Sequence, residues 1–150
     1  MDNASSRGAR NAARVRLPNR ADAVMHYEDF VRSIAFLGQR EKNALIVAGD
    51  EVVDNLFTHG EIGRKGIYAL VRRRAGGITL GLFVQSHGRF RDFATSLEGA
   101  RPNGPRYNPK LGRWHGLGLT MCRNLARSVR YRAGERLDRV FLEFDLIPDR

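Results

Sequence analysis

Glu51 and Asn55 are the first pair of residues whose types and spacing suggest chemistry. They lie four positions apart in a proline-free stretch, so on a helix both side chains project from the same side. A carboxylate and an amide carbonyl are hard oxygen donors suited to Mg²⁺, and a carboxylate can also take a proton from an attacking hydroxyl. Taken alone, the pair is better explained as part of an ordinary solvated helix face, because Glu and Asn are common there.

A glycine-rich segment supplies the second feature. Gly112 to Leu119 leads directly into a pattern of helical spacing, and glycines at such a junction allow backbone N–H groups to approach phosphate oxygens. A Gly-x-Gly before a helix is often only a turn, but its combination with the Glu51/Asn55 helix favours a nucleotide site. The candidate nucleotide-binding residues here are Gly112, Arg113, His115, Gly116, Leu117, Gly118 and Leu119.

A third segment, residues 83–90, reads as a strand that ends in a glycine. Ser86, Gly88 and Phe90 therefore mark a place where backbone could lie against a flat ligand, or alternatively a plain exit from strand to loop. Histidines also occur in or beside the three motifs, and three imidazoles could in principle bind zinc. A role as hydrogen-bond donors near phosphate is the simpler interpretation for these histidines, which are His59, His87 and His115.

In this order the motifs resemble those of the GHKL (histidine-kinase-like) ATP-binding domains, in particular the bacterial anti-sigma-factor serine/threonine kinases of the RsbW and SpoIIAB type. The resemblance covers residues 14–146, and the family's Glu-x-x-x-Asn motif, followed by a histidine and a small residue, matches Glu51, Asn55, His59 and Gly60. It implies that Asn55 ligates the Mg²⁺ that bridges the ATP phosphates, while Glu51 is the base that activates a substrate serine. The loop 91–113 resembles the ATP lid of that family.

The function implied by this resemblance is an ATP-dependent serine/threonine protein kinase that acts as an anti-sigma factor. Its partners would be a sigma factor and a phosphorylated anti-anti-sigma protein of the STAS type, its cofactors ATP and Mg²⁺, and its assembly a homodimer. One departure keeps an alternative open, because Ser86 stands where the family has an aspartate that accepts a bond from adenine. Loss of a charged acceptor costs about 1.5–3 kcal/mol, which leaves a regulatory binding module with weak or lost ATP binding as the second interpretation.

Composition restricts the alternatives. The chain has 150 residues and a formal net charge of +10, which would attract polyanions, yet no nucleic-acid-binding motif is recognisable and general solvation is favoured over a dedicated nucleic-acid face. No apolar run is long enough to span a membrane, and no secretory signal is recognisable near the N-terminus. With Cys122 as the single cysteine, no internal disulfide can form, so a cytoplasmic location is expected.

The elements that must position these motifs follow from periodicity and turn residues. The pattern predicts a loose basic tail over 1–12 and one domain over 13–150, because no repeat or second domain is visible. Helices are expected at 24–37, 39–58 and 117–125, and strands at 14–17, 67–74, 78–86, 129–133 and 139–146, with an irregular loop at 91–113. This order predicts an α/β two-layer sandwich, with about three helices on one face of a mixed, mostly antiparallel sheet, the Bergerat-type ATP-binding fold.

Overall fold

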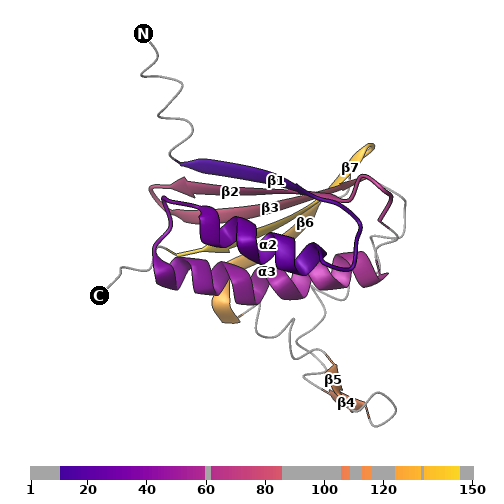
Figure 1. Ribbon diagram of the computed structural model, residues 1–150. Coiled ribbons are helices and arrows are strands. Elements are labelled where there is room, and N and C mark those ends of the chain that lie inside the picture. The colour runs from indigo at the N-terminus through magenta and orange to yellow at the C-terminus, as the bar shows by residue number, and fades with distance from the viewer. Residues whose placement is uncertain are drawn as a thin grey trace.

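A five-stranded antiparallel sheet forms one layer of the protein, and two helices form the other (Figure 1). The computed structural model describes residues 11–59, 62–85, 106–108, 113–115, 124–132 and 134–145. The helices are α2 (Ala23–Ser33) and α3 (Gln39–His59), and both cover the same face of the sheet. In spatial order the strands are β1 (Ala12–Leu17), β2 (Ile67–Arg74), β3 (Gly77–Gln85), β7 (Leu137–Phe144) and β6 (Ser128–Arg132).

Strict alternation of side chains divides the sheet into a buried face and an open face. Along β3, the residues Ile78, Leu80, Leu82 and Val84 are all buried against the helices, as successive side chains of a strand point to opposite sides. The same period of two continues in β2 and β7, whose buried residues join the core between the sheet and α3. Burial of this apolar area is the main source of the sandwich's stability.

The two helices approach each other closely at Tyr27 and Gly49. The Tyr27 hydroxyl donates a 2.6 Å hydrogen bond to the backbone oxygen of Leu45, inside the core. A Cβ atom at Gly49 would lie only 1.9 Å from that hydroxyl oxygen, so only glycine fits there without moving the tyrosine. This contact explains why a residue with low helix propensity occurs in the middle of α3.

The start of α3 is connected to the sheet through a buried carboxylate. Glu41 is 3% exposed, and its Oε1 accepts a 3.0 Å hydrogen bond from the backbone N–H of Gly38, which supplies one of the missing partners at the helix N-terminus. Arg73 of β2 forms an ion pair with the same carboxylate. The pair therefore links the first turn of α3 to the second strand.

The predicted two-layer α/β fold is confirmed, and most element positions are close to those expected from the sequence. The hairpin of β2 and β3 and the strands β1, β6 and β7 agree within about two residues at each described end. The first helix is a correction, because it ends at Ser33 and not at Leu37. Ile34 and Leu37 are nevertheless buried, so apolar periodicity continued into a turn and extended the predicted helix.

One further correction concerns the loop 91–113. The predicted helix 117–125 lies mostly outside the described residues, and its last two residues, 124 and 125, are helical. Two short strands, β4 (Arg106–Asn108) and β5 (Arg113–His115), pair with each other where an irregular loop was predicted. Neither helix in the described part of the chain is both long and apolar enough to cross a membrane.

Candidate functional site

The side chains of Glu51 and Asn55 meet on α3, as their spacing predicts. Asn55 Nδ2 donates a 3.1 Å hydrogen bond to Glu51 Oε1 and a 2.8 Å bond to the Glu51 backbone oxygen. Both residues are half-buried, whereas the neighbouring Asp54 is exposed. The helix therefore holds the acid and the amide in a fixed relationship at the border between core and surface.

This arrangement determines which atoms remain for a ligand. Both partners of the Asn55 amide nitrogen are oxygen acceptors, so the amide is oriented with its Nδ2 toward Glu51 and its Oδ1 on the other side. A carbonyl oxygen is a suitable magnesium ligand, and the second oxygen of Glu51 can accept a proton or a hydrogen bond from bound water. The donor set of the pair therefore fits the magnesium and base roles expected from the sequence.

A pair of carboxyl groups that includes Asp50, the residue before Glu51, was not found by sequence reasoning. Asp50 of α3 contacts Glu28 of α2, and burial, followed by the hydrogen bond and charge of Glu28, raises the pKa of Asp50 to about 8. The hydrogen bond with Asp50 lowers the pKa of Glu28, with help from Arg32. Two carboxyl groups from different helices thus share a proton at neutral pH.

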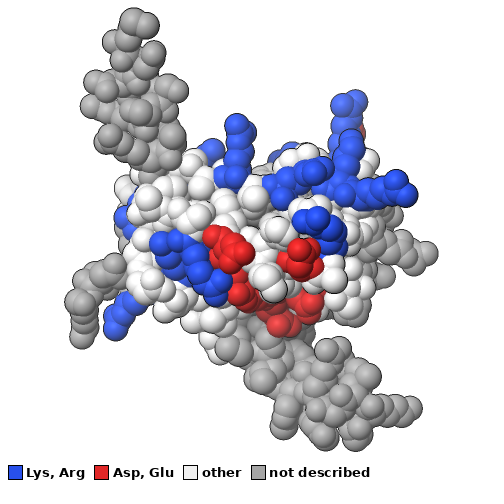
Figure 2. Space-filling model, in the orientation of Figure 1, with Lys and Arg blue, Asp and Glu red and all other residues white. Residues whose placement is uncertain are grey.

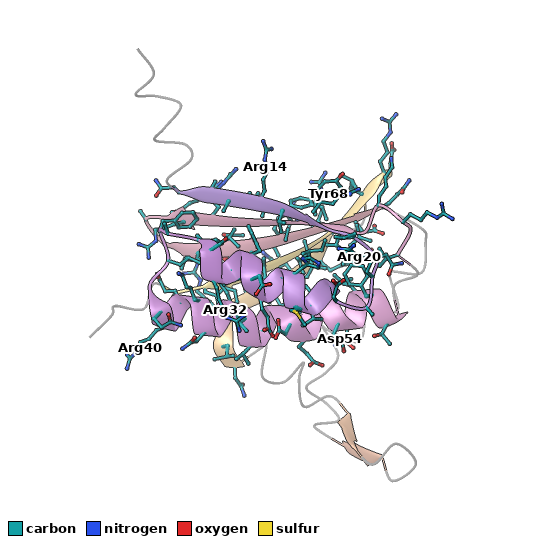
Figure 3. The ribbon with its side chains drawn as sticks, in the orientation of Figure 1. Arg14, Arg20, Arg32, Arg40, Asp54 and Tyr68 are labelled. Carbon is teal, nitrogen blue, oxygen red and sulfur yellow. The ribbon has the colours of Figure 1, made fainter. Side chains whose placement is uncertain are left out.

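No signal in the sequence could reveal this pair. Glu28 and Asp50 are 22 residues apart, and each has the polar type expected on a helix surface. The acidic side chains of the helix layer are visible together near the centre of Figure 2, with basic side chains around them. Asp54, which is labelled in Figure 3, extends from α3 on this outer side and raises the pKa of Asp50 further.

The chain that leaves α3 is held against the start of the fold by two contacts. Asn19 Nδ2 donates a 2.6 Å hydrogen bond to the backbone oxygen of Ile62, and Gly66 adopts a positive φ of 73°. A Cβ at Gly66 would lie 1.8 Å from the backbone oxygen of Leu17, so glycine is required on both grounds. These contacts fix the position of the connection between β2 and the end of α3 that carries Glu51 and Asn55.

The remaining predicted site residues are mostly outside the described part of the chain. His59 is the last residue of α3, and Arg113 and His115 are the first and last residues of β5, where only the backbone is described. The structure therefore brings Glu51 and Asn55 together and leaves the nucleotide loop as a prediction. The predicted residues outside the described ranges are Ser86, Gly88, Phe90, Gly112, Gly116, Leu117, Gly118 and Leu119.

The zinc alternative concerns histidines that lie largely in those same segments. Among the described residues, no group of three or more His, Cys, Asp or Glu side chains is arranged to hold a metal ion. His87 and the side chains of His59 and His115 are outside that description. A magnesium site at Asn55 differs from this alternative because most of its ligands would be phosphate oxygens and water.

Comparison with known proteins gives a likeness of fold. The chain is similar to the crystal structure of the RsbU and RsbW domains of a protein from Mycobacterium tuberculosis, with a TM-score of 0.59 and 13% sequence identity. The likeness covers 90% of this chain and 32% of that chain, so this chain spans about a third of the length of the solved structure. No protein-family model matches the sequence. No curated protein matches it either.

Proposed function

We propose that the chain is a nucleotide-dependent serine/threonine kinase that regulates a sigma factor, as RsbW-type proteins do. The observation that carries the proposal is the half-buried contact between Asn55 Nδ2 and Glu51 Oε1, at 3.1 Å on α3. The overall likeness to a structure that includes an RsbW domain supports the same assignment. The sequence motif suggests the kinase activity, and the fold is compatible with it.

In this proposal each residue of the pair has a separate role. Asn55 would hold Mg²⁺ through its carbonyl oxygen, and the metal would neutralise charge on the ATP phosphates during transfer. Glu51 would keep the Asn55 amide oriented and would accept the proton of the attacking serine hydroxyl. Backbone amides of Gly116 to Leu119 would bind phosphate oxygens, because a helix that begins after glycines offers unpaired N–H donors.

A second candidate function rests on Ser86, which replaces the family's adenine-binding aspartate. A serine hydroxyl accepts a weaker bond than a carboxylate, so the same fold could regulate its partner by contact alone, with weak or lost ATP binding. In such a binding module, Glu51 and Asn55 would have no catalytic role and would be remnants of an ancestral nucleotide site. The kinase is preferred because both residues are present and in contact.

Calorimetric titration with ATP, with and without Mg²⁺, tests the proposal. The natural chain is expected to bind MgATP, Ser86→Asp to bind it more tightly, and Asn55→Ala to lose the magnesium-dependent part of the binding. Asp54→Asn is the matched control, because Asp54 is exposed on the same helix and lies outside the pair. Binding by Ser86→Asp alone would favour the binding module, and binding by neither chain would overturn the nucleotide assignment.

Phosphoryl transfer is tested separately with ATP labelled at the γ-phosphate and purified STAS-type proteins. The kinase proposal predicts label on a serine or threonine of the STAS protein with the natural chain. Glu51→Gln is expected to bind MgATP but to transfer label at least about 100-fold more slowly, as expected for loss of a general base. Transfer at full rate by Glu51→Gln would remove Glu51 from the proposed role.

A further inference from the structure

The face of the sheet that the helices leave uncovered is strongly basic. Alternation along the strands places seven exposed arginines on this face, and Arg14, labelled in Figure 3, points away from the helices. They come from β1 and β2 near one end of the sequence and from β6 and β7 near the other, so the cluster is not evident before the strand order is known. The arginines are Arg14, Arg16, Arg72, Arg74, Arg130, Arg132 and Arg139.

A hollow of about 290 Å³ crosses the middle of this open face. Arg72 and Arg74 of β2 form one side and Arg130 and Arg132 of β6 form the other, with Gly81 and Phe141 among the residues between them. Because β3 and β7 lie between β2 and β6, the two arginine rows are about 14 Å apart, which is three strand spacings. We call this hollow the arginine trough.

The arginines of the trough are largely available to a partner. Among the described residues, no ion pair involves Arg72, Arg74 or Arg132. The one carboxylate that lines the trough, Glu143, is paired with Arg130 and with Arg127, the latter at 3.4 Å. The trough therefore keeps a positive charge that the described chain does not neutralise.

The centre of the trough is formed by aromatic rings and a glycine, and it is apolar. Phe83 and Phe141 meet edge to face, with ring centroids 5.9 Å apart and an interplanar angle of 87°. A Cβ at Gly81 would lie 3.1 Å from the Phe83 ring and 3.4 Å from the Phe141 ring, so the absence of a side chain at Gly81 leaves room for both rings. An apolar centre between two charged rows is therefore the shape offered to a partner.

We propose that the arginine trough binds an acidic amphipathic helix of a protein partner. A helix with its side chains is about 10–12 Å wide, which fits between rows about 14 Å apart. Its apolar stripe would cover Gly81 and Phe141, and Asp or Glu on both flanks would meet the arginines, whose planar guanidinium groups suit carboxylates. This surface is separate from α3, so the inference does not depend on nucleotide binding.

The geometry favours such a helix over the two other occupants that charge alone would allow. Single-stranded nucleic acid needs open aromatic faces for base stacking, whereas in the edge-to-face packing of Phe83 and Phe141 the edge of one ring covers a face of the other. A second copy docked through the same face would bring its arginine rows against these rows, with strong repulsion between like charges. A partner with carboxylates on both flanks of an apolar stripe avoids both difficulties.

Fluorescence anisotropy with defined peptides tests the proposal on the natural chain. The probe is a labelled amphipathic helix of about 18 residues with leucines on one stripe and glutamates on both flanks. The natural chain is expected to bind it, with affinity falling as salt rises, because exposed charges are screened. Arg72→Gln/Arg132→Gln is expected to bind about tenfold more weakly, since two exposed ion pairs contribute about 1–2 kcal/mol together.

Matched controls decide between the outcomes. Arg40→Gln/Arg64→Gln removes the same charge from exposed positions outside the trough, and it is expected to bind the probe within about twofold of the natural chain. A peptide with glutamine in place of glutamate is expected to bind much more weakly. The proposal is overturned if both variants weaken binding equally, if a single-stranded oligonucleotide is bound more tightly at the trough, or if sedimentation shows the trough occupied by a second copy.

Discussion

Glu28 of α2 and Asp50 of α3 join the two helices through a carboxyl–carboxyl hydrogen bond, and this contact makes stability depend on pH. Burial, followed by the Glu28 bond, raises the pKa of Asp50 from 3.8 to about 8, with Asp54 adding to the rise and Arg32 opposing it. One Asp50 oxygen, Oδ1, is buried without a hydrogen-bond partner among the described residues. A proton on the pair supplies the donor that two ionised carboxylates lack.

Asp50→Asn is therefore expected to stabilise the protein at high pH. Because the folded pKa lies above the unfolded one, the favourable contribution of the protonated group is complete below about pH 4 and is lost as pH rises through about 8. Asparagine keeps a donor at all pH values. Since Asp50 is only half-buried, we expect its advantage over the natural chain to grow by about 1–3 kcal/mol from pH 5 to pH 8.5.

Denaturant unfolding at the two pH values measures this effect. Asp29→Asn is the control, because Asp29 is exposed on α2 and pairs only at the surface, with 3.5 Å between its Oδ1 and Arg32 Nη1. Glu28 has the opposite shift, but its pKa is lowered from 4.5, so its contribution is constant above pH 5. An equal effect of Asp50→Asn at both pH values would show that the carboxyls do not share a proton.

The Asn55–Glu51 contact predicts that substitution of Glu51 changes the orientation of the Asn55 amide and, through it, the affinity for MgATP. In Glu51→Ala the amide of Asn55 loses one acceptor, so we expect its orientation to relax and MgATP affinity to fall about three- to tenfold, the equivalent of one hydrogen bond. In Glu51→Gln an acceptor remains, and affinity should stay within about twofold. Calorimetry on both variants distinguishes a positioning role of Glu51 in binding from a role in transfer alone.

The sequence predicts best what local pattern determines. Alternation on both sides of Ala75-Gly76 predicts the β2–β3 hairpin, and spacing of four residues predicts the Glu51–Asn55 contact. Prediction from the sequence fails where tertiary packing buries apolar residues beyond the end of a helix. Ile34 is buried like a helical residue, but its backbone is extended and ends the helix, so the first helix was predicted too long.

Relationships across the sheet are the least predictable. Arg72 and Arg132 lie on one trough only because two other strands separate β2 from β6, and no local pattern gives that order. Sequence reasoning therefore treated the basic charge as general solvation. The nucleotide loop at Gly116 and Gly118 lies outside the described residues, so that part of the candidate site remains a prediction from the motif.

The half-buried Arg73 pairs with the buried Glu41 and so connects β2 to α3, and removal of the arginine is expected to lower stability strongly. Arg73→Met leaves a carboxylate that is 3% exposed without its counter-charge, which we expect to lower the free energy of unfolding by about 2–4 kcal/mol. Arg72→Met, one residue away on the exposed face, should change it by less than about 0.5 kcal/mol. Similar losses in the two variants would mean that the ion pair contributes little.

Gly49 and Gly76 predict opposite outcomes for the same substitution. Alanine favours a helix interior over glycine by about 1 kcal/mol, so propensity alone predicts that Gly49→Ala stabilises α3. The structure reverses that sign, because the new Cβ would lie 1.9 Å from the Tyr27 hydroxyl oxygen and 2.3 Å from its ring carbon Cζ. Moving Tyr27 would also disrupt its hydrogen bond to Leu45, and overpacking of this kind costs about 1–3 kcal/mol or more.

Gly76 is the matched control, since a Cβ there would have no atom within 4 Å and the residue is exposed in the β2–β3 turn. Gly76→Ala is expected to be neutral or to stabilise by up to about 0.5 kcal/mol, through reduced freedom of the unfolded chain. Urea unfolding of both variants should therefore show a lower midpoint for Gly49→Ala only. A midpoint for Gly49→Ala at or above that of the natural chain would contradict the close packing of α2 on α3, because only a shifted Tyr27 could admit the added methyl group.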